Sequence, residues 1–85
     1  MPEVKIGHVA DYFAKISVVA IQIDEGELNV GDTIHIKGHT TDLTCKVDSM
    51  QIEHQSVSKA KKGESIGIKV PDKVRRTDTV YKVLP

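Results

Sequence analysis

The chain has 85 residues, with twelve basic and twelve acidic side chains and a formal net charge of zero. This length predicts a single domain over residues 1–85, and the balanced charge excludes the strongly basic whole-molecule field typical of nucleic-acid binders. Because Cys45 is the only cysteine, an intramolecular disulfide and a thiolate zinc cluster are also excluded, and apolar packing has to provide the stability.

The apolar composition favours an all-β fold. Valine and isoleucine dominate, tryptophan is absent and there is one phenylalanine. Branching at Cβ suits a pleated sheet. The N-terminal stretch MPEVKIGHVA has no basic region followed by a long apolar run, and no stretch approaches the roughly 20 apolar residues of a membrane span. We therefore expect a cytoplasmic protein that does not enter a membrane.

Three strands are predicted in the first half of the chain. Apolar and polar residues alternate from Val4 to Val9, and a polar-aromatic stretch follows. The nearly continuous apolar run Ile16 to Ile23 predicts a strand covered on both faces along part of its length. Thr33 to Lys37 alternates most clearly, and Gly31-Asp32 before it predicts a tight turn in which Gly31 has positive φ and Asp32 bonds local backbone.

A long strand is predicted from Leu43 to His54. Its apolar residues change parity between Val47 and Met50, which would turn them to opposite faces of a regular strand. A β-bulge near Asp48-Ser49 would shift the register by one residue and let the strand curl around a small barrel.

Two more strands complete the prediction. Gln55 to Gly63 reads as a basic loop or a short helical turn, after which Ser65 to Val70 alternates. A charged connection, Asp72 to Asp78, precedes the last strand, Thr79 to Leu84. Six strands with turn signals at intervals of about 8–12 residues are typical of sandwiches and barrels.

Four segments in this order match a known pattern: GELNVGDTIHIKG (26–38), VDSMQIEH (47–54), AKKGESIGIKV (60–70) and VRRTD (74–78). Together they resemble the second domain of translation elongation factors, whose motifs include G-x-L-x-V-G-D and a V-R-R-G-like approach to the last strand. The chain also looks like small stand-alone elongation-factor-like proteins and the C-terminal barrel of some collagenase-like peptidases. The resemblance implies a six-stranded Greek-key β-barrel of the elongation factor domain 2 type.

No pattern for catalysis is present, and we expect a protein that is not an enzyme. The phosphate-binding loop G-x-x-x-x-G-K-[ST] is missing, so this chain alone is expected to bind no nucleotide. The four histidines lack zinc-ligand spacing, and Cys45 lies mid-strand, where a thiol behaves as a small hydrophobe. We therefore predict no catalytic residue, no metal and no cofactor.

The resemblance implies a role for Glu64, because the similar glutamate of elongation factor Tu lies in the pocket for the terminal adenosine of aminoacyl-tRNA. A turn carboxylate that caps backbone is the alternative. The sequence departs from that family at Ala20-Ile21-Gln22, where Thr-Gly-Arg is expected, and at Pro71, where an arginine is expected.

Two basic loops are expected to converge on one rim and contact phosphates, with solvated loop charge as the alternative. Their basic residues are Lys59, Lys61, Lys62, Lys73, Arg75 and Arg76. Tyr12 and Phe13 are consecutive, so one should be core and the other a surface aromatic on which a base can stack.

These patterns predict a non-enzymatic, translation-factor-like module that contacts RNA, either a tRNA end or the ribosome, through its basic loops. The alternative is a protein-interaction module that completes a separately encoded partner enzyme through exposed sheet surface.

Overall fold

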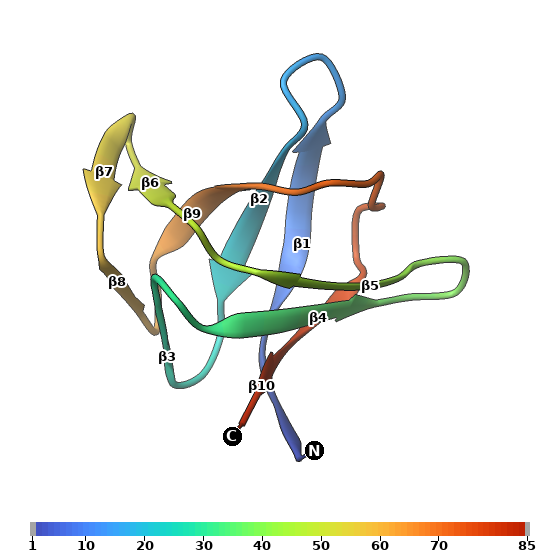
Figure 1. The fold of residues 1–85 in the computed structure, drawn as a ribbon, viewed down its shortest axis with the longest axis horizontal. Coiled ribbons are helices and arrows are strands. Elements are labelled where there is room, and N and C mark those ends of the chain that lie inside the picture. The colour runs from blue at the N-terminus through green and yellow to red at the C-terminus, as the bar shows by residue number, and fades with distance from the viewer. Residues whose placement is uncertain (1, 85) are drawn as a thin grey trace.

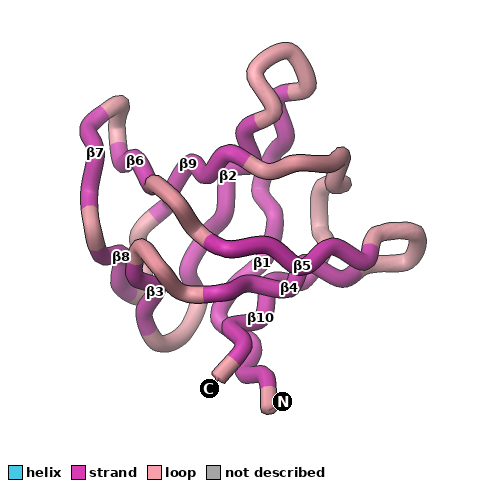
Figure 2. Tube along the Cα trace, viewed as in Figure 1, coloured by secondary structure: helices cyan, strands magenta, loops and turns pink. Residues whose placement is uncertain are grey.

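The computed structural model describes residues 2–84, and all of their regular secondary structure is β (Figures 1 and 2). The all-β prediction is therefore confirmed. No helix that the structure describes is long and apolar enough to cross a membrane. The strands are β1 (Glu3–Phe13), β2 (Val18–Ile23), β3 (Glu27–Asn29), β4 (Thr33–Lys37), β5 (Asp42–Lys46), β6 (Met50–Ile52), β7 (Gln55–Val57), β8 (Lys59–Lys61), β9 (Ser65–Lys69) and β10 (Thr79–Val83).

Eight strands form one antiparallel sheet in the order β5-β4-β10-β1-β2-β9-β6-β7, and β3 and β8 form a separate ribbon. Ten strands thus replace the six that the pattern predicts. The six strands with five or more residues are β1, β2, β4, β5, β9 and β10, and the other four have three residues each. Strands this short carry too few residues to show alternation.

The sheet curls around one apolar core, to which β2, β4 and β9 each contribute alternate buried side chains. Val19, Ile21 and Ile23 of β2 point inward, and the intervening residues are half-buried. The second face of β2 is thus partly covered, in partial agreement with the prediction, but the strand begins only at Val18. Ile16 lies in the preceding turn and is 60% exposed.

β1 is irregular on both of its edges, with register shifts between Lys5 and Gly7 against β10 and between Val9 and Asp11 against β2. These irregularities let β1 pair with β10 along one edge and with β2 along the other. The N-terminal end of β1 lies beside the C-terminal end of β10, because the backbone N–H of Leu84 donates to the carbonyl of Pro2 at 2.8 Å. Figure 1 shows both chain ends on the same side of the molecule.

The parity change after Val47 has a different cause from the predicted bulge. The strand is interrupted, with β5 ending at Lys46 and β6 beginning at Met50. Val47 is buried and bonds to the turn before β4, donating to the Asp32 carbonyl at 2.8 Å and accepting from Gly31 N–H at 2.8 Å. These bonds continue the β4–β5 pairing by one residue, and the strand breaks between Val47 and Met50.

Two short strands, β7 and β8, occupy the segment predicted as a basic loop or helical turn. β6 and β7 form a hairpin in which Ile52 faces Gln55, and both turn residues, Glu53 and His54, have positive φ (49° and 66°). This is the left-handed geometry of a type I′ hairpin turn. It holds these two side chains at the edge of the sheet.

The tight turn before β4 is as predicted. Gly31 has φ of 99°, and the Asp32 carboxylate accepts the backbone N–H of Asn29 at 2.8 Å. The glycine and the aspartate therefore serve the turn itself.

Thr77 occupies the position of the glycine in the V-R-R-G-like motif and has φ of 70°. A β-branched residue is strained there. We expect Thr77→Gly to raise the free energy of unfolding by about 0.5–1 kcal/mol, because relief of strain exceeds the added chain entropy of the unfolded state. Urea unfolding checks this, with Thr79→Gly in β10 as the control, which should lower the stability instead. Equal effects from the two variants would contradict the prediction.

Candidate protein-docking surface

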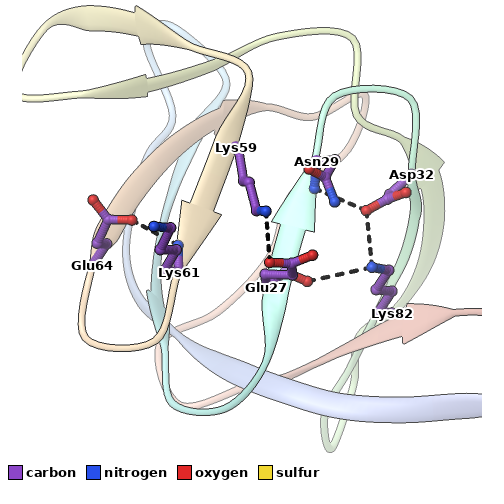
Figure 3. Close-up of polar contacts among 7 residues, drawn as sticks. All are labelled: Glu27, Asn29, Asp32, Lys59, Lys61, Glu64 and Lys82. Carbon is purple, nitrogen blue, oxygen red and sulfur yellow. Dashed lines mark hydrogen bonds and ion pairs between the residues drawn. The ribbon is translucent and has the colours of Figure 1, made fainter.

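One group of the predicted site residues lies on the β3–β8 ribbon (Figure 3). The Lys59 ammonium is 3.0 Å from the Glu27 carboxylate, and this lysine lowers the pKa of Glu27 chiefly through that hydrogen bond. The Glu64 carboxylate accepts the backbone N–H of Lys61 at 2.6 Å. Glu64 therefore caps the turn between β8 and β9, which is the alternative considered for it, while Lys62 is exposed in that turn.

Lys82 extends this polar network, and no sequence pattern singled it out. Its ammonium lies 3.3 Å from the Asp32 carboxylate and donates to the Glu27 carbonyl at 3.5 Å. Figure 3 shows Lys59 and Lys82 on either side of Glu27. Glu27 on the ribbon and Asp32 in the following turn thus already engage two cations, Lys59 of β8 and Lys82 of β10.

The second group surrounds an open hollow of about 540 Å³ lined by Asp11, Tyr12, Lys73, Val74, Arg75 and Arg76. Arg76 contacts Asp11 through two nitrogens at 3.3 Å. The pKa of Asp11 is lowered, first by the backbone N–H of Tyr12 and then by Arg76. Tyr12 packs against the core, whereas Phe13 is 48% exposed and faces a different hollow.

The structure does not bring the two basic groups to one rim. Figure 1 shows β8 and the connection between β9 and β10 on different sides of the molecule. The ion pairs with Glu27 and Asp11 further reduce the free positive charge of each group. The continuous phosphate-binding surface expected from the basic loops is therefore not formed.

An apolar trench of about 300 Å³ lies on the outer face of the sheet. It is lined by Phe13, Ile16, Val18, Ala20, Gln51, Glu53, His54, Ser65, Ile66 and Gly67. Its floor is a cross-strand row in which Gly67 of β9 faces Ala20 of β2 on one side and Gln51 of β6 on the other. The β1–β2 hairpin and the β6–β7 turn form its two ends.

Among the residues that line this trench, Phe13 is the one that the sequence predicts as a site residue. An isolated glycine inside a strand pattern often marks close approach of another backbone, and Gly67 is such a signal. Its neighbours could not be assigned to the same surface without the strand register.

His35 forms a compact ionic cluster with Glu3 and Asp42 at the other end of the sheet. Its Nδ1 is 2.8 Å from Glu3 and its Nε2 is 2.5 Å from Asp42, while its ring lies 6.1 Å from that of Tyr81. The Asp42 hydrogen bond raises the pKa of His35, against an opposing effect of desolvation and with further help from Glu3. Both ring nitrogens therefore act as donors in the protonated form.

This cluster predicts a pH dependence of stability. A histidine whose pKa is higher in the folded state stabilises the fold fully below its unfolded pKa of about 6.5, and this contribution is lost as pH rises through the higher folded value. We expect the difference in urea-unfolding free energy between wild type and His35→Gln to be larger at pH 5.5 than at pH 9. A difference that does not change with pH would contradict the role of the cluster.

No group of three or more His, Cys, Asp or Glu residues within residues 2–84 is arranged to hold a metal ion. Cys45 is half-buried, and desolvation, with a smaller effect of Asp48, raises the pKa of its thiol. The thiolate is the nucleophilic form, so this environment makes Cys45 a weak nucleophile.

The fold matches that of a small C-terminal β domain of known structure. The structure superposes on the C-terminal domain of a Geobacillus thermoleovorans protein assigned to the U32 peptidases, with a TM-score of 0.86, 16% identity and coverage of 94% of this chain and 92% of that domain. The selenomethionine variant of that domain matches with a TM-score of 0.83, 15% identity and coverage of 89% and 95%. At this identity the match establishes the fold alone.

Proteases also appear among the relatives in sequence. A collagenase of Porphyromonas gingivalis W83 is 40% identical over 81 residues, which make up 94% of this chain and 20% of that protein. An uncharacterized protease of Methanocaldococcus jannaschii is 44% identical over 80 residues, 93% of this chain and 19% of its own length. The chain thus spans about a fifth of these relatives. No protein-family model matches it.

These findings overturn the assignment to translation factors. Sequence relatives are named as proteases and the matched structures are peptidase C-terminal domains, so the prediction of a translation-factor-like RNA-binding module is wrong. The shared motifs have a physical explanation in turn geometry. Gly31 and Gly63, central to two of them, have φ of 99° and 91°, conformations that other residues rarely adopt and that favour glycine whatever the domain binds.

Proposed function

We propose that this chain is a non-catalytic accessory domain that completes a peptidase by protein contact. The peptidase region is either a separate chain or another part of the same polypeptide. One observation carries the proposal: identity of 40% to 44% extends over nearly all of this chain but over only about a fifth of the proteases. Four fifths of those proteins remain for the catalytic region.

The environment of the reactive side chains supports a non-catalytic role. The pKa of the Cys45 thiol is raised, and His35 is held between two carboxylates. A nucleophile needs a lowered pKa or an adjacent base, and neither arrangement activates one. Collagen cleavage, which the names of the Porphyromonas proteins state, is assigned by this proposal to the rest of the enzyme.

We also propose that the curled sheet and the β3–β8 ribbon complete a small Greek-key barrel built on the six longer strands. Support comes from backbone bonds between Val47 and the turn at Gly31 and Asp32, and from Val30 N–H to the Ser58 carbonyl at 3.0 Å. The Val47 bonds join the end of β5 to the turn that connects the ribbon to β4, and the Val30 bond extends the β3–β8 pairing by one step. The cytoplasmic location expected from the sequence stays a prediction.

A chimera tests the proposed function. The matching fifth of the P. gingivalis W83 collagenase is deleted, or replaced by this chain, and cleavage of gelatin and of collagen is measured. We expect the deletion to lose most of its activity, the chimera to recover it, and the isolated 85-residue chain to cleave neither substrate. Full activity of the deletion, or cleavage by the isolated chain, would overturn the proposal.

A further inference from the structure

We propose that the apolar trench is the surface that docks the peptidase region, and that it receives an apolar side chain adjacent to a basic one on an extended segment. The inference rests on the proposed function and names the contact surface for it. Figure 1 shows the β1–β2 hairpin and the β6–β7 hairpin projecting from the sheet, and β9 is the strand between them in the sheet order. The trench runs between these two projections.

Its floor is low because the two smallest side chains available lie next to each other. Ala20 and Gly67 are direct cross-strand partners, while the rows on either side pair Val18 with Lys69 and Gln22 with Ser65. On the opposite face of the same strands, Ile21, Ile66 and Ile68 fill the core. The outer face is therefore notched at one row in a sheet that is fully packed beneath it.

Gly67 is not required by the backbone. Its φ is not in the left-handed region, and a Cβ built on it would meet Val18 Cγ1 at 3.4 Å, which is ordinary contact. Glycine inside a strand costs stability relative to alanine and commonly marks close approach of another backbone or ligand. Access to the sheet surface, rather than folding, explains the glycine.

The walls expose apolar surface that the isolated domain leaves in water. Phe13 is 48% exposed and Ile16 is 60% exposed, and both line the trench from the tip of one hairpin. Removal of such side chains from water is favourable by about 25 cal/mol per Å². A docked apolar side chain would cover both.

Charge complementarity defines the second part of the occupant. Glu53 lies at the opposite end of the trench, and its carboxylate forms no ion pair with any residue between 2 and 84. Positive φ at Glu53 and His54 fixes this end of the surface in a tight turn. A lysine or arginine beside the buried apolar side chain would pair with Glu53.

Size favours a segment over a second copy of this chain. A volume of about 300 Å³ accommodates one or two side chains. A stable protein pair normally buries about 800 Å² on each partner. The trench fits an anchor within a larger contact, as the peptidase region of the same assembly would provide.

Hydrogen exchange in the chimera tests the inference. Backbone amides of residues 13–18 and 51–54 should exchange at least tenfold more slowly in the collagenase chimera than in the isolated 85-residue chain, while those of the β3–β8 ribbon stay unchanged. Ala20→Leu, which fills the floor, should abolish that protection and cut gelatin cleavage by tenfold or more. Gly67→Ala should weaken the protection several-fold and raise the thermal midpoint of the isolated chain. Glu53→Gln should also weaken the protection, but it should leave the thermal midpoint unchanged.

Val4→Ser is the matched control, since Val4 is 42% exposed and lies outside the trench. It should leave both protection and cleavage unchanged. If the chimera is active but its trench amides exchange as fast as in the isolated chain, the trench is not the docking surface. The accessory role would still stand. Titration of the labelled isolated chain with the truncated collagenase provides a second readout, with shifts expected at Gly67 and Phe13. If the chimera is inactive and the titration gives no shift anywhere, both proposals fall.

Discussion

Gly7→Ala is expected to lower the free energy of unfolding by about 3 kcal/mol, the upper part of the usual range for overpacking. A Cβ on Gly7 would collide with the backbone carbonyl oxygen of Gln22 and lie 3.3 Å from Ile23 Cα. Both atoms belong to β2, which pairs with β1 on one side and β9 on the other. The neighbour is a paired backbone, so it cannot move aside as a flexible side chain would.

Urea unfolding followed by circular dichroism measures this effect. Gly67→Ala is the control, because its new methyl group meets only ordinary contacts. Should Gly7→Ala lose no more stability than Gly67→Ala, the close approach of β1 and β2 at Gly7 would be wrong.

Ile21→Ala should cost about 3–4 kcal/mol, within the range for removal of a buried isoleucine. Ile21 has no exposed surface, and it lies in the central part of the sheet between Val9 on β1 and Ile66 on β9. The lost side chain leaves a cavity that three paired strands cannot collapse to fill.

Ile16→Ala makes the same chemical change at a residue that is 60% exposed. We expect it to alter the unfolding free energy by less than about 0.5 kcal/mol. The comparison, made by thermal and urea unfolding on both variants, separates burial from residue type. A similar loss for the two isoleucines would contradict the position of the core.

Alternation predicted most of the main sheet. Ile34 and Ile36, Ile66 and Ile68, and Val80 are buried on strands close to their predicted bounds, because a period of two is visible over five residues. Leu28 on β3 and Ala60 on β8 are equally buried, but each has a single inward side chain on a three-residue strand. Their pairing is determined by tertiary contacts that local pattern does not encode.

The candidate site was harder to predict than the fold. The sequence predicts Phe13 as a surface aromatic for base stacking, whereas Ala20, Gly67 and Gln51 become one surface only through the register of three strands. The prediction of phosphate contacts by the basic loops is wrong for a related reason. Lys59 forms an ion pair with Glu27 and Arg76 with Asp11, and both carboxylates come from distant parts of the chain. Long-range pairing decides which charges remain free.

The pairing of β1 with β10 also determines how the domain responds to force. The backbone bond from Leu84 to Pro2 and the pairing of Glu3 with Val83 place the N-terminal end of β1 beside the C-terminal end of β10. Tension applied through the two termini therefore peels the pair open one hydrogen bond at a time, as a zipper opens, instead of loading all bonds at once in shear. The domain should yield at low force from its ends, while β2, β9 and β4 keep their own partners until the core is exposed.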